Sequence, residues 1–326
     1  MTAMVLNTKL YWNIEINHKL KINMKHLKII LLIILVYSLN GLSAQTATDR
    51  AWWESLSPEW KRVMQKQHFK GKDITPTDEQ LSEIGKMVFL DIEGNKEIKD
   101  LKPAAALQIL EIIKAKGSGL ESLEGIEAII NIKEIDVSDN DNINSLVPLS
   151  NLYNLEEINC GNTMVKSLVP LRNLTKLKKL DLHLTTIVDL RILKDLKNLQ
   201  ELDISENVSL YSLDGVNYMP ELSVLDCSDT NVDDLTPVSK LPLLSTLDCS
   251  NTKVYSLKPI QLVKSLQDID VSETAIDGSA LDYLLGHSNL TMIRAKKIKI
   301  TDQEIKDFEG LLQKRNPTAT IIITKK

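Results

Sequence analysis

The chain has 326 residues, of which 43% are apolar but only 4% aromatic, so its core must be built from aliphatic side chains. Such a core favours regular stacking over an irregular globule. The net charge is −5, and residues 1–44 contain five Lys and one Glu, so residues 45–326 carry −9. This acidic balance argues against a nucleic-acid partner.

Residues 1–44 are predicted to be a leader outside the fold, with a signal peptide at about 24–44. A basic stretch, Met24–Lys28, precedes the aliphatic run Ile29–Val36, and small residues follow up to Ala44. This order is typical of a secretory signal peptide, and we expect cleavage after Ala44. The apolar run is too short to span a bilayer comfortably. The mature chain is therefore expected in the periplasm, on the cell surface or in the medium, without a transmembrane span.

Residues 48–86 are predicted to form a helical N-terminal cap. Ser57 followed by Pro58 predicts a helix that continues to about His68. Thr77–Gln80 has the form of a capping box and predicts a second helix. The neighbouring Trp52 and Trp53 have two interpretations: they cover the open end of the core, or they are exposed and stack on sugar rings.

About ten repeats of 22–24 residues occupy 87–300. Their template is L-x-x-L-x-L-x-x-[N/T], and the units begin at Met87, Leu110, Ile132, Leu155, Leu177, Leu199, Leu222, Leu244, Leu266 and Leu290. The alternation in L-x-L predicts one short strand per unit, with its leucines pointing inward. One unit cannot bury its apolar edge alone, so the units must stack in parallel around a continuous core.

This template resembles the leucine-rich-repeat family, specifically the 22-residue class of bacterial internalin-like surface proteins. The resemblance covers about residues 87–300. It implies an α/β repeat solenoid, a right-handed superhelix with a parallel concave β-sheet and capped ends, and it implies protein partners. Prolines recur at one position beyond the turn, which predicts a mostly extended or 3-10 convex side.

Polar residues recur at the ninth position of the units. The three 23-residue units carry Asn95, Asn140 and Asn207 there, whereas five units carry Thr and the second carries Ser118. We expect an inward Asn amide to satisfy turn backbone groups of the next coil, and a shorter hydroxyl to reach less far.

Three cysteines, Cys160, Cys227 and Cys249, occupy the sixth position, which points inward. They are predicted to be buried and free, because equivalent positions of parallel strands suit a disulfide poorly. His183, at a seventh position, is predicted to be a solvated residue of the strand surface.

Residues 301–326 are predicted to form a C-terminal cap of one helix and one strand. Thr301–Glu304 is a capping box that opens the helix, and Asn316-Pro317 ends it. Thr320–Thr324 is expected to add the final strand.

The exposed strand positions differ in charge pattern. At the second position, Glu111, Lys133, Glu156 and Lys178 alternate in sign and are expected to pair across strands. The fifth position carries an unbroken stripe of carboxylates, and four serines follow two residues later: Asp181, Asp203, Asp226, Asp248 and Asp270, with Ser205, Ser228, Ser250 and Ser272. This stripe is either a recognition surface for a cationic partner or a structural habit of leucine-rich repeats. Its linear spacing offers no closed cage for Ca²⁺.

No motif of catalytic or cofactor chemistry stands out. The sequence contains no C-x-x-C, no His-rich cluster and no Gly-rich phosphate loop. We therefore predict a monomeric, exported, non-enzymatic scaffold, without metal or cofactor, that binds a protein partner through its concave face, with adhesion as one version. The alternative is a carbohydrate-binding or structural cell-envelope protein that uses Trp52 and Trp53, or Tyr211 and Tyr218.

Overall fold

The computed structural model describes residues 49–325, which belong to two compact units. One unit contains the residues up to Glu54 together with Pro76–Ser82, and the other contains Ser55–Thr75 and the chain from Glu83 onward. The predicted leader, its signal peptide and the cleavage site lie outside the described residues. Within 49–325, no helix is long and apolar enough to cross a membrane.

Both helices predicted before the repeats are present. Residues 49–55 are also helical. Helix α3 (Pro58–Phe69) begins as predicted, because the Ser57 hydroxyl accepts a hydrogen bond from the Trp60 amide at 3.3 Å. Helix α4 (Asp78–Ile84) follows Thr77, whose amide donates to the Gln80 side chain at 2.8 Å.

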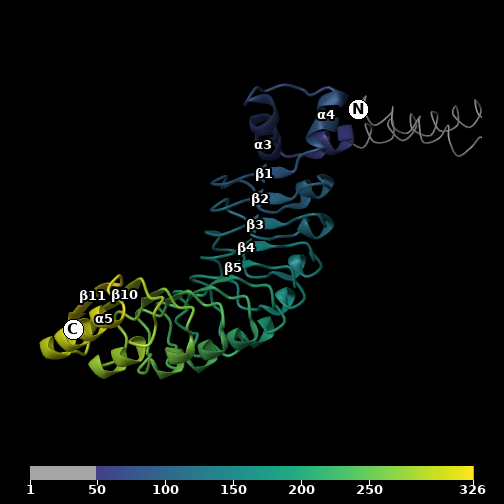
Figure 1. The fold of residues 1–326 in the computed structure, drawn as a ribbon. Coiled ribbons are helices and arrows are strands. Elements are labelled where there is room, and N and C mark those ends of the chain that lie inside the picture. Colours follow the sequence, from purple (N-terminus) through teal and green to yellow (C-terminus); the bar gives the residue numbers. More distant parts are fainter. Residues whose placement is uncertain (1–48, 326) are drawn as a thin grey trace, which may run out of the picture. The chain divides into compact units, whose positions relative to one another are not determined.

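Eleven parallel strands form one sheet in sequence order (Figure 1). Each of the first ten strands begins at the third position of a repeat, so the predicted units and their register are confirmed. The strands are β1 (Phe89–Asp91), β2 (Ile112–Lys114), β3 (Glu134–Asp136), β4 (Glu157–Asn159), β5 (Lys179–Asp181), β6 (Glu201–Asp203), β7 (Val224–Asp226), β8 (Thr246–Asp248), β9 (Asp268–Asp270), β10 (Met292–Ile298) and β11 (Thr320–Lys325).

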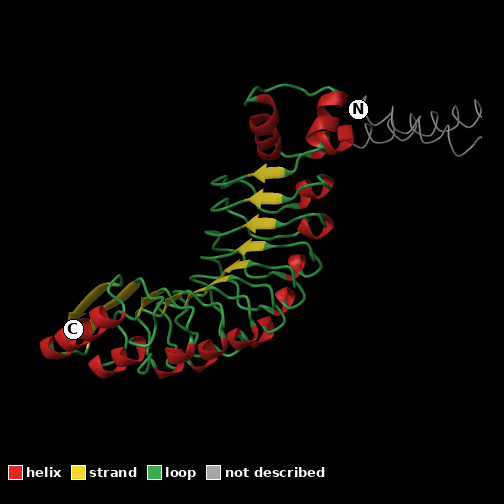
Figure 2. Cartoon of the chain, viewed as in Figure 1, coloured by secondary structure: helices red, strands yellow, loops and turns green. Residues whose placement is uncertain are grey.

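Short 3-10 segments return the chain on the side of the coils opposite the sheet, as predicted (Figure 2). Prolines occupy the first turn of several of them and leave no N–H without a partner there. The segments are η2 (Lys102–Ala106), η3 (Ile126–Ala128), η4 (Val147–Leu149), η5 (Val169–Leu171), η6 (Arg191–Leu193), η7 (Val216–Tyr218), η8 (Thr236–Lys240), η9 (Lys258–Leu262) and η10 (Gly278–Leu284).

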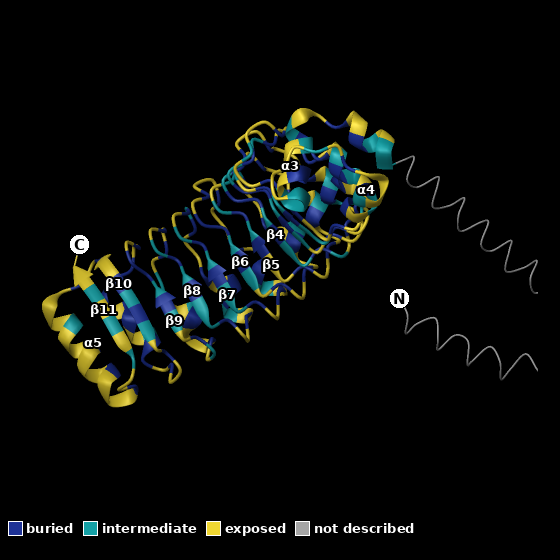
Figure 3. Ribbon diagram, turned by 90° about the horizontal axis from the view of Figure 1, so that it is seen from above, coloured by how far each residue is buried: buried dark blue, intermediate teal, exposed yellow. Residues whose placement is uncertain are grey.

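The core between the sheet and the 3-10 segments is aliphatic and continuous from coil to coil (Figure 3). Leu177, Leu180 and Leu182 illustrate the pattern of one coil, since all three side chains are almost fully buried. Burial of each such side chain contributes about 1.5–3 kcal/mol. Neighbouring coils supply the other wall of this core, as the stacking argument predicted.

Hydrogen bonds from the ninth-position residues correct one expectation. The Asn140 side-chain amide donates to the carbonyls of Ala115 and Val137, and its oxygen accepts from the Leu120 amide at 2.9 Å. These contacts join Asn140 to its own coil and to the preceding coil, not to the next one as predicted. Thr230 donates only within its own coil, to the Cys227 carbonyl at 2.7 Å, as its shorter reach predicts.

The predicted C-terminal elements are also present. Helix α5 (Asp302–Arg315) begins with a complete capping box between Thr301 and Glu304. Its side chains Phe308 and Leu312 are buried. Strand β11 pairs in parallel with β10 and closes the sheet.

His287 stands in the core at a position where the other coils place Leu, Ile, Met or Val. The side chain is 1% exposed, and neither ring nitrogen makes a hydrogen bond of good geometry with a described residue. Burial, and then the charge of Lys264, lower the pKa of His287 below its ordinary value. The folded state must therefore keep the ring neutral.

Replacing His287 by Leu should stabilise the protein, because it restores the aliphatic repeat and removes an unsatisfied buried group worth about 1–3 kcal/mol. The pKa of His287 is lower in the folded state than in the unfolded state. The stability of the wild type is therefore retained above the unfolded-state pKa and falls as the pH drops below it. Urea unfolding at pH 7.5 and pH 5 should show a larger gain for His287→Leu at pH 5. An equal gain at both pH values would contradict this explanation.

Candidate functional site

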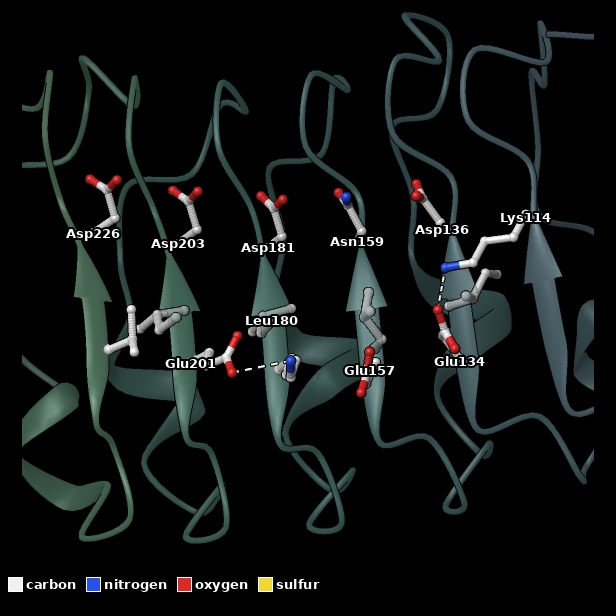
Figure 4. Close-up of a pocket in the computed structure, with 15 residues that line it drawn as sticks. Lys114, Glu134, Asp136, Glu157, Asn159, Leu180, Asp181, Glu201, Asp203 and Asp226 are labelled. Atoms are coloured by element: carbon white, nitrogen blue, oxygen red, sulfur yellow. Dashed lines mark hydrogen bonds and ion pairs between the residues drawn. The ribbon is translucent and has the colours of Figure 1, made fainter. Parts of the chain in front are cut away.

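A groove with a volume of about 420 Å³ crosses the outer surface of the sheet from β2 to β7. We call this surface, which points away from the core, the strand face. Charged side chains line the groove along two lines, the fifth-position carboxylates such as Asp203 and the third-position side chains such as Glu201 (Figure 4). The groove is thus formed by the sheet itself, and each strand from β2 to β7 contributes residues to it.

Ion pairs between adjacent coils neutralise one side of the strand face. The predicted pairing at the second position is confirmed, since Lys133 binds Glu111 at 2.8 Å and Lys178 binds Glu156 at 2.6 Å. Third-position carboxylates are paired as well, because Glu134 binds the fifth-position Lys114 (Figure 4) and Glu201 binds the third-position Lys179. Exposed pairs of this kind each contribute about 0.2–1 kcal/mol at most.

The fifth-position carboxylates lie side by side, because every strand pairs with the next in the same register. We call Asp181, Asp203, Asp226, Asp248 and Asp270 the acidic row. Their strands place Asp181 opposite Asp203, and so on in sequence to Asp270. Figure 4 shows the first three members continuing from Asp136 and Asn159. The sequence therefore predicted the alignment of this row correctly.

The serines of the candidate site are bound to the acidic row itself. Asp203 Oδ1 accepts from the Ser205 amide at 2.9 Å and from its hydroxyl at 2.7 Å. The same two bonds recur from Ser228 to Asp226 and from Ser250 to Asp248. Ser272 uses only its amide toward Asp270, and its hydroxyl accepts from the Lys296 amide.

These bonds explain why Asp and Ser recur two residues apart. Each carboxylate holds the turn that follows its strand, and Ser205 and Ser272 are buried at 8% and 7% exposure. The interpretation of the stripe as a structural habit of the repeat therefore explains the hydrogen bonds of Oδ1 and of the serine hydroxyls. Oδ2 of Asp203, Asp226 and Asp248 makes no hydrogen bond to a described residue, so these bonds leave one oxygen of each carboxylate for a binding partner.

Two members of the row resist ionisation. Burial raises the pKa of Asp226 and of Asp248, and the neighbouring carboxylates of the row raise it further, against the lowering effect of the serine hydrogen bonds. The row is thus an electrostatically costly arrangement in the free protein. A cation or a hydrogen-bond donor that binds there would relieve this cost.

The prediction that His183 is a solvated residue of the strand surface is wrong, because its ring is bound to Asp181. Its Nδ1 lies 2.6 Å from Asp181 Oδ1, and the ring is half-buried. Burial of the ring lowers the pKa of His183, but the hydrogen bond and charge of Asp181 outweigh this effect, so that the pKa is raised overall. Asp181 therefore has a partner, and the members without a cationic partner begin at Asp203.

The ring of His183 needs Gly161 on the preceding coil. A Cβ atom at Gly161 would lie 2.1 Å from the Nδ1 and Cε1 atoms of His183, so no other residue fits there without movement of the ring. Both residues occupy the seventh position, where five other coils carry Ser. This paired departure from the repeat is visible in the sequence, but its meaning depends on the contact between coils, and sequence reasoning missed it.

The cysteines offer no reactive thiol. Cys160, Cys227 and Cys249 are fully buried and free, as predicted. The Sγ atoms of Cys227 and Cys249 lie 3.3 and 3.4 Å from carbonyl oxygens of the next coil. Burial raises the pKa of all three thiols well above its usual range, which makes them poor nucleophiles.

The fold is that of known leucine-rich-repeat proteins. The internalin InlF of Listeria monocytogenes aligns with a TM-score of 0.64 and 17% identity, over 82% of this chain and 89% of that one. The functional domain of InlJ from the same organism, which includes a cysteine ladder, aligns at 0.61 and 18%, over 85% and 61%. The plant peptide hormone receptor RGFR1, solved in complex with RGF2, aligns at 0.55 and 17%, over 73% and 37%.

This chain thus spans less than two thirds of the InlJ domain and of the receptor. No protein-family model matches the sequence, and no curated protein matches it significantly. At these identities the likeness establishes the fold alone. The leucine-rich-repeat solenoid predicted from the sequence is therefore confirmed, and its structural neighbours include internalins.

Asp248→Asn should stabilise the free protein at neutral pH, because it removes a charge between Asp226 and Asp270 and keeps an acceptor for Ser250. The native Asn159 holds the Gly161 amide in this way at 3.0 Å. We expect a gain of about 1 kcal/mol, the scale of two charges about 5 Å apart. Since the folded-state pKa is raised, the cost appears as the pH rises from the unfolded-state to the folded-state pKa.

Urea unfolding at pH 7 and pH 3.5 measures this effect. The gain should be present at pH 7 and smaller at pH 3.5, because the raised pKa of Asp248 favours its protonated form at acidic pH. Asp234→Asn is the matched control, because Asp234 accepts the same two bonds from Thr236 outside the strand face. A gain that persists undiminished at pH 3.5 would show that repulsion within the row is not its cause.

Proposed function

We propose that this chain is an exported leucine-rich-repeat scaffold that binds a protein partner through its strand face. The observation that carries the proposal is the groove, in which ion pairs satisfy one side while Asp203 and Asp226 form no ion pair with a described residue. Asp248 continues this arrangement on the next strand. Complementary charge favours a partner with Lys or Arg side chains along the row. Adhesion to another cell is one form that this binding takes.

The charge pattern supports this choice over a purely structural role. Four carboxylates at the second and third positions, Glu111, Glu134, Glu156 and Glu201, each pair with a lysine on an adjacent coil. No described lysine forms an ion pair with a member of the acidic row, although one lysine per coil beside the row would be enough to pair every carboxylate. Asn159 shows that a neutral residue can hold the same turn. The charge of the row is therefore not required by the turn hydrogen bond.

A non-enzymatic role agrees with the chemistry of the described residues. The three thiols are buried, and the groove contains ion pairs and turn-binding carboxylates. RGFR1, a receptor with the same fold, forms a complex with its peptide hormone. Binding of a macromolecule, without catalysis, is thus the function that the fold and the groove support best.

The proposed organisation is a leader of 1–44, a cap of 48–86, repeats over 87–300 and a final cap of 301–326. We propose that the mature chain is monomeric and is released by cleavage after Ala44. Mass spectrometry of the protein purified from its native host should give Gln45 as the first residue. Ile33→Arg, which breaks the apolar run, should abolish export and leave the leader attached. Export of this variant at the wild-type level would contradict the signal-peptide proposal.

The triple variant Asp203→Asn, Asp226→Asn, Asp248→Asn should lose its partner, because it removes three adjacent charges and keeps the turn acceptors. The measurement is capture by the immobilised protein from surface extracts of the native host. We expect at least a tenfold loss in the partner that the wild type retains. Binding should also weaken with salt, since exposed charges are screened within about 10 Å at 0.1 M.

The matched control is Asp100→Asn, Asp234→Asn, Asp277→Asn. Each of these residues accepts an amide two positions later, so the control changes the net charge equally and alters the same local motif outside the acidic row. Capture should be unchanged in the control. If the control loses the partner as well, net charge and not the row determines binding. If neither triple variant loses it, the strand-face proposal fails.

The carbohydrate-binding alternative retains only part of its basis. Trp53 is 5% exposed and presents no face on which a sugar ring could stack. Tyr211 is 65% exposed, whereas the ring of Tyr218 lies 5.1 Å from Lys197 Nζ. Tyr218 is 51% exposed, so exposure favours this alternative at Tyr211 and Tyr218. Glycan-array binding that survives Tyr211→Ala would exclude the version that uses Tyr211.

A further inference from the structure

We propose that Asp181, His183 and Asp203 form a binding site for a divalent transition-metal ion of the Zn²⁺ type. One ligand atom from each of the three side chains lies within 4.8 Å of the other two. Zinc bonds of about 2.0–2.2 Å separate tetrahedral ligand atoms by roughly 3.3 Å. The three ligand atoms therefore lie close enough together for adjustments of the side chains to bring them to the distances of a zinc site.

The ligand set suits a transition metal better than a hard cation. Imidazole nitrogen and carboxylate oxygen are both ligands of Zn²⁺, and three protein ligands leave a further position open. Ca²⁺ requires six to eight oxygen ligands, which a linear row does not provide. The histidine therefore distinguishes this position from the rest of the acidic row.

The repeat is altered here in two places that fit one another. His183 replaces a seventh-position Ser, and Gly161 on the preceding coil removes the Cβ atom that would lie 2.1 Å from the ring. The ring thus lies over the preceding coil and fills the space that a side chain at Gly161 would occupy. On its other side, the register of β5 and β6 brings Asp203 next to Asp181. The imidazole therefore lies close to Gly161 of the preceding coil and to Asp203 of the next one.

The local charge also favours a cation. Asp203 and Glu206 act on His183 in addition to Asp181, and all three are negative. The nearby Lys179 is engaged by Glu201 at 3.1 Å. Asp181 thus binds the imidazole directly, and Asp203 acts on it from the next coil through its charge. A dication would neutralise them, in a part of the groove where neighbouring carboxylates repel one another.

A simpler explanation is that His183 merely replaces Ser as the partner of Asp181. It accounts for the bond of 2.6 Å between them, because Ser205 makes an equivalent bond to Asp203 at 2.7 Å. The two explanations differ in what His183→Ser does. This substitution inserts the residue of the neighbouring coils and retains a donor for Asp181, so a purely structural histidine would be replaced without consequence for metal binding.

Isothermal titration of the purified protein with ZnCl₂, after removal of metal by a chelator, tests the proposal. We expect saturable binding of one ion per chain. His183→Ser and Asp203→Asn should each weaken it by about tenfold or more. Asp234→Asn, which removes a turn-binding carboxylate outside the strand face, should bind Zn²⁺ as the wild type does. Excess Ca²⁺ should not displace Zn²⁺.

A spectroscopic readout separates the site from unspecific attraction of cations. Co²⁺ should give visible d–d bands with the wild type, and His183→Ser should lose them. Circular dichroism and urea unfolding establish that each variant is folded. Absence of saturable Zn²⁺ binding would overturn the proposal. Equal affinities of the wild type and His183→Ser would also overturn it, and would assign any bound cation to the acidic row alone.

Discussion

In-register pairing of parallel strands is the constraint on which this structure depends. A strand of three residues recurs every 22 to 24 residues, and each pairs with its neighbours without a shift from β1 to β9. Equivalent positions of successive units therefore become neighbours about 4.8 Å apart. Any residue type that recurs in the repeat becomes a row, whether it is a buried leucine, a lysine–glutamate pair or a carboxylate.

This constraint explains why much of the molecule could be predicted from the sequence. Period and alternation predicted the strands, and Ser57, Thr77 and Thr301 predicted where helices begin. The acidic row followed from the register alone. Contacts that depend on the direction of a side chain could not be obtained in this way. The side chain of Asn140 points inward, as the repeat predicts. Only the geometry of the turn directs its amide to Ala115 in the preceding coil.

His183 was misjudged for a related reason. Spacing placed it on the surface, and surface position alone suggested a solvated ring. The fifth and seventh residues of a coil, however, lie together at the end of the strand, as the Asp203–Ser205 bond shows. The ring also occupies space vacated by Gly161, a residue 22 positions earlier. An apparently isolated substitution in a repeat must therefore be judged with its counterparts on both adjacent coils.

The same coil departs from the repeat once more, at Leu184. The eighth residue adopts a left-handed backbone, with φ of 48° at Leu184, and other coils place Gly, Asp, Asn, Glu or Lys there. This conformation costs about 1–2 kcal/mol for residues other than glycine, and Asn and Asp tolerate it best. An exposed leucine gains little from packing to offset that cost. The departures from the repeat at Gly161, His183 and Leu184 thus lie at one end of the acidic row. They give this end of the strand face a surface that differs from that of the other coils.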